Sequence, residues 1–326
     1  MTDVGRVSPA LRDDHLGLAL DPQMRAVVEM FQQHFDEPMR VLGASEIRAR
    51  RAALSRGASP TSELAAVVDL VIPGRDCGIP ARHYRPQSGP AQGVVVYFHG
   101  GGWVFGGIDE SDGLCRLLAG LTGCDVVSVD YRLAPEHPYP AAANDAVDAV
   151  DWVSNTIAAQ APLVVMGDSA GGNLVAAAVQ HASRSERTEI VLQVLVYPVL
   201  DHRMSTASYR DRGERLLISA DDMDWFWSQY VPDIAMRGEV GASPGLSADL
   251  RGLPPTIVVV AEHDPLHDEG LDYAHRLGEA SVPTTVHRYD TMAHGFFSMV
   301  GALTVADDAV RAVAVAISDA CRPSKP

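Results

Sequence analysis

Short apolar runs alternate with longer stretches of helical periodicity along most of the chain. The runs have the length of buried strands and occupy residues 66–72, 94–98, 125–129, 162–166, 190–196, 256–260 and 284–289. The helical stretches lie near residues 141–157, 172–183, 267–279 and 303–319. This alternation predicts an α/β fold with a mostly parallel central sheet and helices on both faces.

Two more helices are predicted before the first strand. Asp21 and Pro22 open the first, and its apolar face carries Met24, Val27, Val28, Phe31 and Phe35. The second runs through Glu46 and Ile47 to Leu54 and ends near Gly57. Neither helix belongs to the strand and helix alternation, so we expect both to lie outside the sheet.

Composition restricts the partners more than the fold. With 326 residues, 47% of them hydrophobic, the chain is long enough to bury a large core. The net charge of −16 argues against nucleic acid and anionic membranes, because either would need a basic patch. The basic stretch from Arg48 to Arg56 is interpreted as the solvated face of a helix.

Cysteines and the amino terminus favour a cytoplasmic protein. Cys77, Cys115, Cys124 and Cys321 have no C-x-x-C spacing and are too sparse for a disulfide scaffold, so we expect buried thiols. The amino terminus lacks the pattern of a signal peptide, and no apolar stretch reaches the roughly 20 residues of a membrane helix. We therefore expect no stable membrane insertion.

The segment from Gly167 to Gly171 has the form G-x-S-x-G and lies where an apolar run meets an Ala-rich helix. In such a turn the flanking glycines allow tight backbone packing, and the serine hydroxyl is held above the sheet. Short matches of this kind also arise by chance, as a strand turning into a helix through small residues. The context makes Ser169 the candidate nucleophile.

A second glycine-rich turn, Gly100 to Gly102, follows the apolar run at 94–98. Acyl transfer forms an oxyanion that backbone N–H groups can stabilise where no side chain prevents close approach. Gly101 and Gly102 fit this need, together with the N–H of Ala170. The spacing matches no phosphate-binding motif, which argues against a nucleotide cradle.

Asp264 is the candidate acid. It follows the strand predicted at 256–260, where a carboxylate is well placed to fix the tautomer of a histidine and stabilise its imidazolium. An Asp-Pro pair is also a common helix start, with the aspartate as N-cap. Asp268 and Glu269 are assigned to the first turn of that helix, where negative charge suits the helix dipole.

His294 is the candidate general base, and chain order distinguishes it from the other histidines, of which there are 12 in all. The order Ser169, Asp264, His294 is that of nucleophile, acid and base in α/β hydrolases. A zinc site at His263 and His267 is a competing interpretation. Two histidines four apart share a face only on a continuous helix, and Pro265 makes a helix at His263 unfavourable.

The sequence resembles the bacterial hormone-sensitive-lipase family of serine esterases from about Leu20 to the C-terminal helix. The matching segments are His99-Gly100-Gly101-Gly102-Trp103, Asp130-Tyr131-Arg132-Leu133-Ala134-Pro135-Glu136, Gly167-Asp168-Ser169-Ala170-Gly171-Gly172, Tyr197-Pro198, Asp264-Pro265-Leu266 and His294-Gly295-Phe296. The aspartate before the nucleophile is similar to that of the Asp-Ser-Ala-Gly branch. One departure is Glu262-His263, where the family more often has small or apolar residues.

This resemblance implies an α/β-hydrolase fold with a small helical cap. Residues 1–60 would form cap helices, and 61–326 a catalytic domain with a second cap segment near 203–240. Within that segment, Ser219 to Tyr230 carries Trp225, Phe226 and Trp227, which either pack in the core or line an apolar pocket. The segment from Asp130 to Glu136 is interpreted as structural.

The implied activity is hydrolysis of short- to medium-chain acyl esters. Ser169, activated by His294, would form an acyl-enzyme intermediate that water then hydrolyses, without a cofactor or a metal. Relatives on this fold that act as dehydratases or bind small molecules keep those alternatives open, as does hydrolysis of amides or lactones by the same groups. Homodimers also occur among such enzymes.

Overall fold

An eight-stranded sheet forms the centre of the protein, with the strand order β1-β2-β4-β3-β5-β6-β7-β8. It is seen in a computed structural model that describes residues 19–55, 63–87, 91–185, 189–212 and 216–322. The strands are β1 (Ala66–Pro73), β2 (Gly78–Arg85), β3 (Val94–Phe98), β4 (Asp125–Val129), β5 (Leu163–Asp168), β6 (Ile190–Val196), β7 (Thr256–His263) and β8 (Thr284–Ala293). From β4 to β8 neighbouring strands run parallel, whereas β2 is antiparallel to both β1 and β4.

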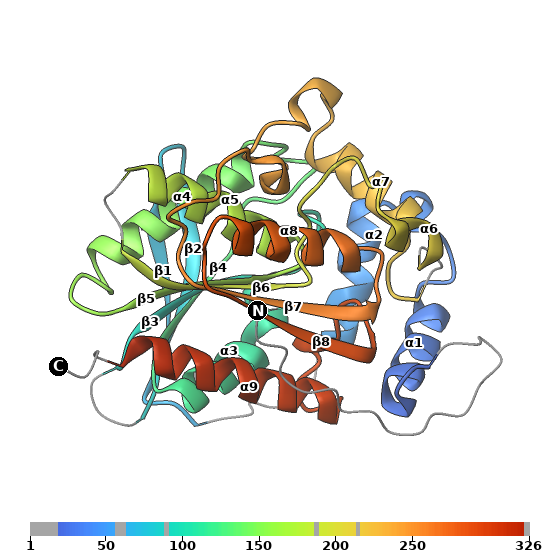
Figure 1. Ribbon diagram of the computed structural model, residues 1–326. Coiled ribbons are helices and arrows are strands. Elements are labelled where there is room, and N and C mark those ends of the chain that lie inside the picture. The colour runs from blue at the N-terminus through green and yellow to red at the C-terminus, as the bar shows by residue number, and fades with distance from the viewer. Residues whose placement is uncertain (1–18, 56–62, 88–90, 186–188, 213–215, 323–326) are drawn as a thin grey trace.

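Helices cover both faces of this sheet, as predicted. They are α1 (Pro22–His34), α2 (Met39–Ser55), α3 (Ile108–Thr122), α4 (Ala141–Asn155), α5 (Ala170–Ser185), α6 (Ala207–Asp211), α7 (Ala220–Tyr230), α8 (His267–Glu279) and α9 (Thr304–Cys321). Helices α4, α5 and α8 pack on one face, and α3 and α9 on the other (Figure 1). None of the described helices is long and apolar enough to cross a membrane.

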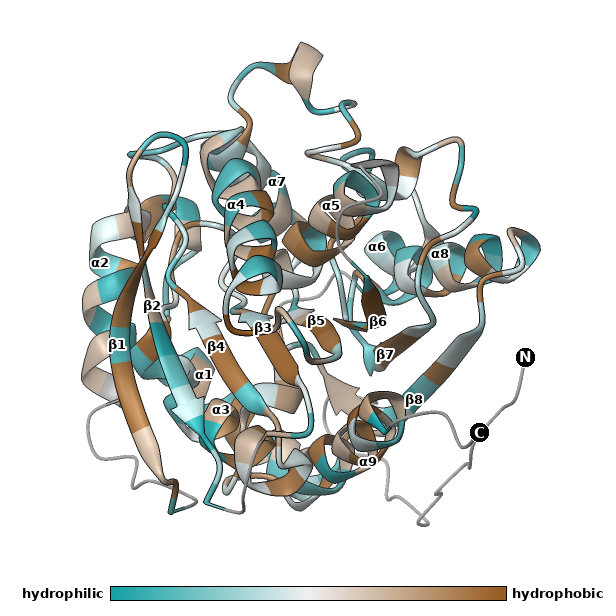
Figure 2. Ribbon diagram, turned by 90° about the vertical axis from the view of Figure 1, so that its left-hand side faces the viewer, coloured by the Kyte–Doolittle hydropathy of each residue, from teal (hydrophilic) through white to brown (hydrophobic). Residues whose placement is uncertain are grey.

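Two apolar cores lie on the two faces of the sheet. The side chains of β3 alternate between them: Val94, Val96 and Phe98 contact one core, and Val95 and Tyr97 the other. Because both faces are covered, the central strands are continuously apolar and were recognisable in the sequence. Figure 2 shows this hydrophobic character along β3, β6 and β7.

The sequence missed β2 and α3. In β2, residues such as Arg82 and His83 interrupt the apolar pattern, because this strand is half exposed between an edge strand and β4. In α3 the apolar residues that reach the core are Leu114, Cys115, Leu118 and Ala119, while the first turn is acidic. Strand β2 therefore lacks the continuous apolar run by which the other strands were predicted, and the polar first turn of α3 hides where its helical pattern begins.

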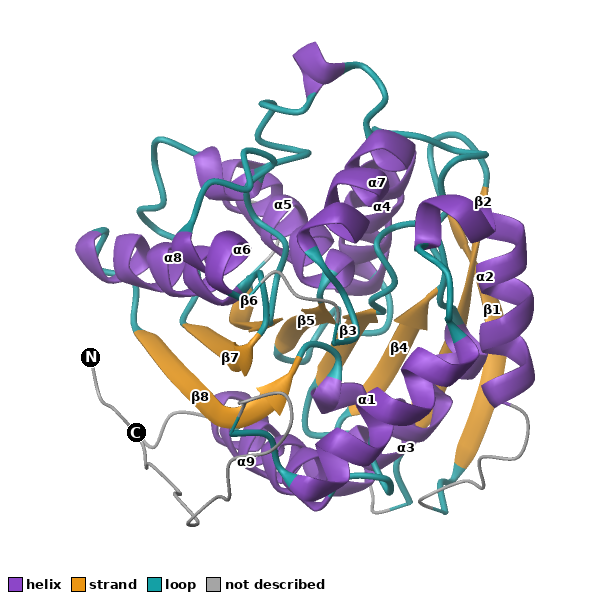
Figure 3. Ribbon diagram, turned by 90° about the vertical axis from the view of Figure 1, so that its right-hand side faces the viewer, coloured by secondary structure: helices purple, strands orange, loops and turns teal. Residues whose placement is uncertain are grey.

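The amino-terminal helices form as predicted and stand outside the sheet. The side chain of Asp21 caps α1 by accepting from the N–H groups of Gln23 and Met24. Helix α2 is bent at Gly43, whose φ of 73° is left-handed. Figure 3 shows α1 and α2 in front of the sheet. The predicted end near Gly57 and the domain boundary after residue 60 lie outside the described residues.

The structure corrects one expectation about the cysteines. Cys115, Cys124 and Cys321 are buried, but Cys77 is exposed. It lies in the turn between β1 and β2, where its carbonyl accepts from the N–H of Gly74. A tight turn at the edge of the sheet leaves its side chain with no core to enter.

Candidate active site

Ser169 lies at the sharp turn between β5 and α5. Its φ of 56° is left-handed, which is unfavourable for a residue with a side chain. Three backbone hydrogen bonds hold it there: its N–H donates to Val196, and its carbonyl accepts from Val199 and Asn173. The surrounding structure therefore enforces a strained conformation at the candidate nucleophile, as is common at functional sites.

The two glycines of this turn are required by backbone contact. A Cβ on Gly167 would lie 2.5 Å from the carbonyl oxygen of Gly171. A Cβ on Gly171 would collide with the carbonyl oxygens of Phe98 and His99, at the end of β3. The turn is thus pressed against the neighbouring glycine-rich loop, and any side chain at either position would separate the two.

The structure brings Ser169, Asp264 and His294 together. Asp264 follows Ser169 by more than 90 positions in the sequence, and His294 follows Asp264 by 30. The hydroxyl of Ser169 lies 2.9 Å from Nε2 of His294. Nδ1 of the same imidazole donates to Oδ2 of Asp264 over 2.8 Å. All three side chains are at least 90% buried, so this hydrogen-bonded chain is largely shielded from water.

Both carboxylate oxygens of Asp264 are occupied. Oδ2 accepts from His294, and Oδ1 accepts from the backbone N–H of Leu266 over 2.8 Å. The carboxylate is therefore fixed by its own loop before it orients the histidine. Helix α8 begins only at His267, so the aspartate precedes the helix cap position.

The glycine-rich loop lies beside the nucleophile. Gly101 and Gly102 line the same cavity as Ser169 and have left-handed φ values of 121° and 58°. Side chains there would collide with Phe105 and Phe226, respectively. Ala170 is the first residue of α5, and the N–H of such a residue has no acceptor within its own helix. Of the predicted oxyanion donors, Gly101 and Gly102 thus share a cavity with Ser169, and Ala170 directly follows it in the chain.

Asp168 connects the nucleophile turn to this loop. Its Oδ1 accepts from the N–H of Gly100 over 2.9 Å and from the hydroxyl of Tyr97 over 2.5 Å. Burial raises the pKa of the Asp168 carboxyl, an effect opposed by the Tyr97 hydrogen bond and by His99 and His294. The sequence marked Asp168 only as a branch signature and missed Tyr97, whose role depends on a cross-strand contact.

Ser169 and His294 open into a cavity of about 360 Å³. Much of its wall is apolar and comes from α1, α2, α7 and the residues just before α7. The apolar side chains from these segments are Val27, Met30, Phe31, Met39, Leu217, Ile218, Met223 and Phe226. Of the three aromatic residues singled out in the sequence, Phe226 lines the cavity, whereas Trp227 packs against Trp103. Both interpretations of that aromatic cluster thus hold for different members.

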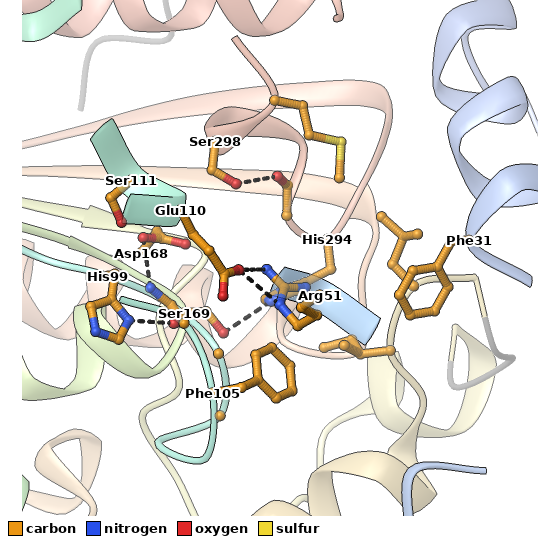
Figure 4. A pocket seen from close by; sticks show the side chains of 18 of the residues that line it. Phe31, Arg51, His99, Phe105, Glu110, Ser111, Asp168, Ser169, His294 and Ser298 are labelled. Atoms are coloured by element: carbon orange, nitrogen blue, oxygen red, sulfur yellow. Dashed lines mark hydrogen bonds and ion pairs between the residues drawn. The ribbon is translucent and has the colours of Figure 1, made fainter. Parts of the chain in front are cut away.

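An ion pair crosses this cavity wall. Nε and Nη2 of Arg51 in α2 donate to Oε2 of Glu110 in α3 over 2.9 and 2.6 Å. The Arg51 guanidinium also lies 4.5 Å above the ring of Phe105. Figure 4 shows the pair near Ser169 and His294. The solvated-face interpretation of the basic stretch is therefore wrong for Arg51, which lines the same cavity as Ser169 and His294.

The same correction applies to Arg48. Its guanidinium donates to the carbonyls of Val104 and Ala134 and pairs with Glu136. This contact lowers the pKa of the Glu136 carboxyl to about 2. Arg48 and Arg51 alternate with exposed residues on α2, so their inward orientation was invisible without knowing which face the helix presents.

The polar residues after β7 do not form the zinc-binding helix considered above. His263 ends β7 and His267 begins α8, so the two lie on different elements. His267 lies 3.0 Å from Asp268, and Glu262 accepts from Arg212 over 2.7 Å. Among the residues that the structure describes, no three metal-binding side chains are placed to hold an ion.

Comparison with known proteins agrees with this architecture. A family model described as alpha/beta hydrolase fold matches residues 95–298. The carboxylic ester hydrolase LipN of Mycobacterium tuberculosis is 42% identical over 72% of this chain and 65% of its own length. The ethyl acetate hydrolase of Pseudomonas putida is 34% identical over 92% and 99%. A crystal structure of a thermostable esterase from Pseudomonas putida ECU1011 superposes with a TM-score of 0.88 at 30% identity, covering 94% of this chain and 98% of that one.

These similarities extend over the sheet, the nucleophile turn and the loops at the carboxyl ends of the strands. The chain belongs to the alpha/beta hydrolase fold family, among carboxylic ester hydrolases.

Proposed function

We propose that this protein hydrolyses carboxylic esters with Ser169 as nucleophile, His294 as general base and Asp264 as the group that orients the base. One observation carries the proposal: a continuous hydrogen-bonded chain runs from the Ser169 hydroxyl through both imidazole nitrogens to a buried carboxylate. A serine hydroxyl is a weak nucleophile by itself, and an adjacent oriented base activates it.

The reaction proceeds in two steps on these groups. Ser169 attacks the acyl carbonyl as its proton passes to Nε2 of His294, and the histidine returns that proton to the leaving alcohol. Water then attacks the acyl-enzyme with the same histidine as base. In both steps the N–H groups of Gly101, Gly102 and Ala170 stabilise the oxyanion, and loss of one donor would cost roughly 3 kcal/mol.

The substrates are short- to medium-chain acyl esters. The cavity of about 360 Å³ is bounded by cap helices and by the Arg51–Glu110 ion pair. Its apolar wall suits an alkyl or aryl group, and the similarity to an ethyl acetate hydrolase supports the shorter acyl chains. The net charge of −16 favours small neutral substrates over nucleic acid. A homodimer stays a prediction that light scattering tests.

The decisive experiment compares the wild type with Ser169→Ala on p-nitrophenyl esters from acetate to palmitate. We expect the wild type to prefer the shorter chains and the variant to lose activity by a factor of about 10⁴ or more. The matched control is Ser228→Ala, because Ser228 is an exposed serine on α7 whose hydroxyl donates to the Trp225 carbonyl and accepts from the Gln229 side chain. Full activity of Ser169→Ala would rule out the proposed nucleophile.

Two additional measurements separate the alternatives. Activity that persists in a chelator excludes a required metal. Parallel assays on p-nitroanilides and lactones show whether the same groups prefer amide or cyclic ester bonds. A wild type that is folded but inactive on all three substrate classes would instead favour the dehydratase or small-molecule-binding interpretation.

A further inference from the structure

Two buried thiols meet at the amino ends of the parallel strands, the end of the sheet opposite the candidate active site. Cys124 directly precedes β4, and Cys321 is the last residue of α9. Their sulfur atoms lie 3.8 Å apart, although the residues are 197 positions apart in the chain. Strands β4 and β5 both run parallel to β3. The start of β4 therefore lies at the amino ends of the parallel strands, whereas Ser169 follows β5 at their carboxyl ends.

The surrounding structure fixes this pair. A Cβ on Gly93 would lie 2.5 Å from the sulfur of Cys321. The thiol therefore occupies space that is free only because residue 93 has no side chain. The Thr122 hydroxyl accepts from the N–H of Cys124 over 3.1 Å, and the Thr122 carbonyl accepts from the Ser318 hydroxyl over 3.3 Å. One threonine thus binds both the turn that carries Cys124 and the last turns of α9.

The contact also changes the reactivity of the thiols. Hydrogen bonding from Cys321 lowers the pKa of Cys124, which favours the thiolate, the reactive form. The same contact and burial raise the pKa of Cys321. Cys115, by contrast, is buried away from this pair, and burial raises its pKa. Of the three buried cysteines, Cys124 is the one whose pKa is lowered.

We propose that Cys124 and Cys321 form a site of reversible oxidation, at which a hydroperoxide such as hydrogen peroxide converts the two thiols into a disulfide. The Cys124 thiolate attacks one peroxide oxygen, so that an S–O bond forms, the O–O bond breaks and hydroxide leaves. The Cys321 sulfur then displaces the second hydroxide from the sulfenic acid. The two thiol protons convert both hydroxides to water, and the peroxide accepts the two electrons.

This disulfide would fasten the end of α9 to the start of β4. It closes a loop of about 200 residues, a length at which a cross-link strongly restricts the unfolded chain. The active site would be little affected, because the five residues of β4 separate the two ends of the sheet by about 17 Å. The expected effect is therefore on stability and not on the rate of hydrolysis.

The test starts from the reduced wild type, treated with equimolar hydrogen peroxide and then alkylated with iodoacetamide in denaturant. Of the four cysteines, two should escape alkylation, and the intact mass before alkylation should fall by about 2 Da. Peptide mapping should find Cys124 joined to Cys321, and dithiothreitol should reverse the link. We expect the Tm to rise by about 5 °C, with an unchanged rate of p-nitrophenyl acetate hydrolysis.

Matched variants locate the effect. Cys77→Ser removes the exposed thiol and should retain both the cross-link and the Tm shift, whereas Cys321→Ser should lose both. If the Cys321→Ser variant fails to fold, the Cys124→Ala variant is used in its place. The peptide map is measured on the wild type and depends on neither variant. Four alkylated thiols, oxygen additions without a cross-link, or a cross-link to Cys77 would each overturn the proposal. Because the readouts are mass and Tm, they do not depend on the proposed triad.

Discussion

At the scale of single residues, the most informative side chain next to the nucleophile is Asp168. It is buried, and one of its oxygens receives both the Gly100 N–H and the Tyr97 hydroxyl. Gly100 begins the loop that carries the proposed oxyanion donors. Asp168 is thus expected to act as a positioning residue, because both of its hydrogen bonds hold the loop against the turn that carries Ser169.

Replacing Asp168 should separate this positioning role from a role of its charge. Asp168→Ala leaves two buried donors without an acceptor, which costs roughly 1–3 kcal/mol each. We expect kcat for p-nitrophenyl acetate to fall by up to about 100-fold, with a smaller change in KM, because the displaced loop stabilises the oxyanion less well. Asp168→Asn keeps an acceptor oxygen and should restore most of kcat. Equal losses in both variants would show that the charge matters instead.

At the scale of elements, helices α1, α2 and α7 supply much of the wall of the cavity at Ser169. Helix α2 is attached to the rest of the protein by Arg48, which binds Val104 and Glu136, and by Arg51, which binds Glu110. Only the second of these pairs lines the cavity. A long acyl chain that extends along α2 would have to approach this charged pair and desolvate it.

Removing that charge should extend the acyl range. Arg51→Met keeps a long side chain over Phe105 but replaces the guanidinium by an apolar group. We expect the ratio of kcat/KM for the octanoate over the acetate ester to rise about threefold to tenfold, since apolar contact replaces desolvation of a charge. Arg50→Met is the control, because Arg50 pairs with Glu46 and Asp36 within the cap region. If both variants leave the ratio unchanged, Arg51 does not limit chain length.

At the scale of the whole molecule, Glu269 links α8 to the segment after β6. It is only 4% exposed, and its Oε1 accepts from the N–H of Leu200 over 2.8 Å. Burial raises the pKa of the Glu269 carboxyl well above its ordinary value, although the Leu200 hydrogen bond opposes the shift. Glu269 lies in the first turn of α8, as the sequence predicted, but its carboxyl group is buried there and does not face solvent.

Glu269 should make the stability of the fold depend on pH. The folded protein keeps a proton that the unfolded chain releases above the ordinary pKa of 4.5, so this contribution is present in acid and is lost as the pH rises toward the folded pKa. Glu269→Gln removes the titration. From pH 5 to pH 8, its free energy of unfolding in urea should gain on that of the wild type by up to about 1.4 kcal/mol per pH unit. Parallel curves would contradict this.

The sequence by itself determined the parallel sheet, its helical coverage and the order of the three candidate catalytic residues. Strands buried on both faces have continuous apolar runs, such as Val94–Phe98, which can be recognised in the sequence. The glycines of the nucleophile turn are equally visible, because backbone contact excludes every side chain at Gly167 and Gly171. A local steric requirement of this kind fixes the residue type at a single position, so it can be recognised in the sequence.

Only the tertiary structure decided which polar side chains turn inward. Arg51, Glu110 and Tyr97 look like ordinary surface or strand residues in the sequence, and their roles arise from partners 59 and 71 positions away. The same holds for Cys124 and Cys321, which meet across 197 positions. Hydrophobic periodicity records how deep a residue lies, whereas a directed contact between two polar groups depends on the relative placement of whole elements, which folding alone sets.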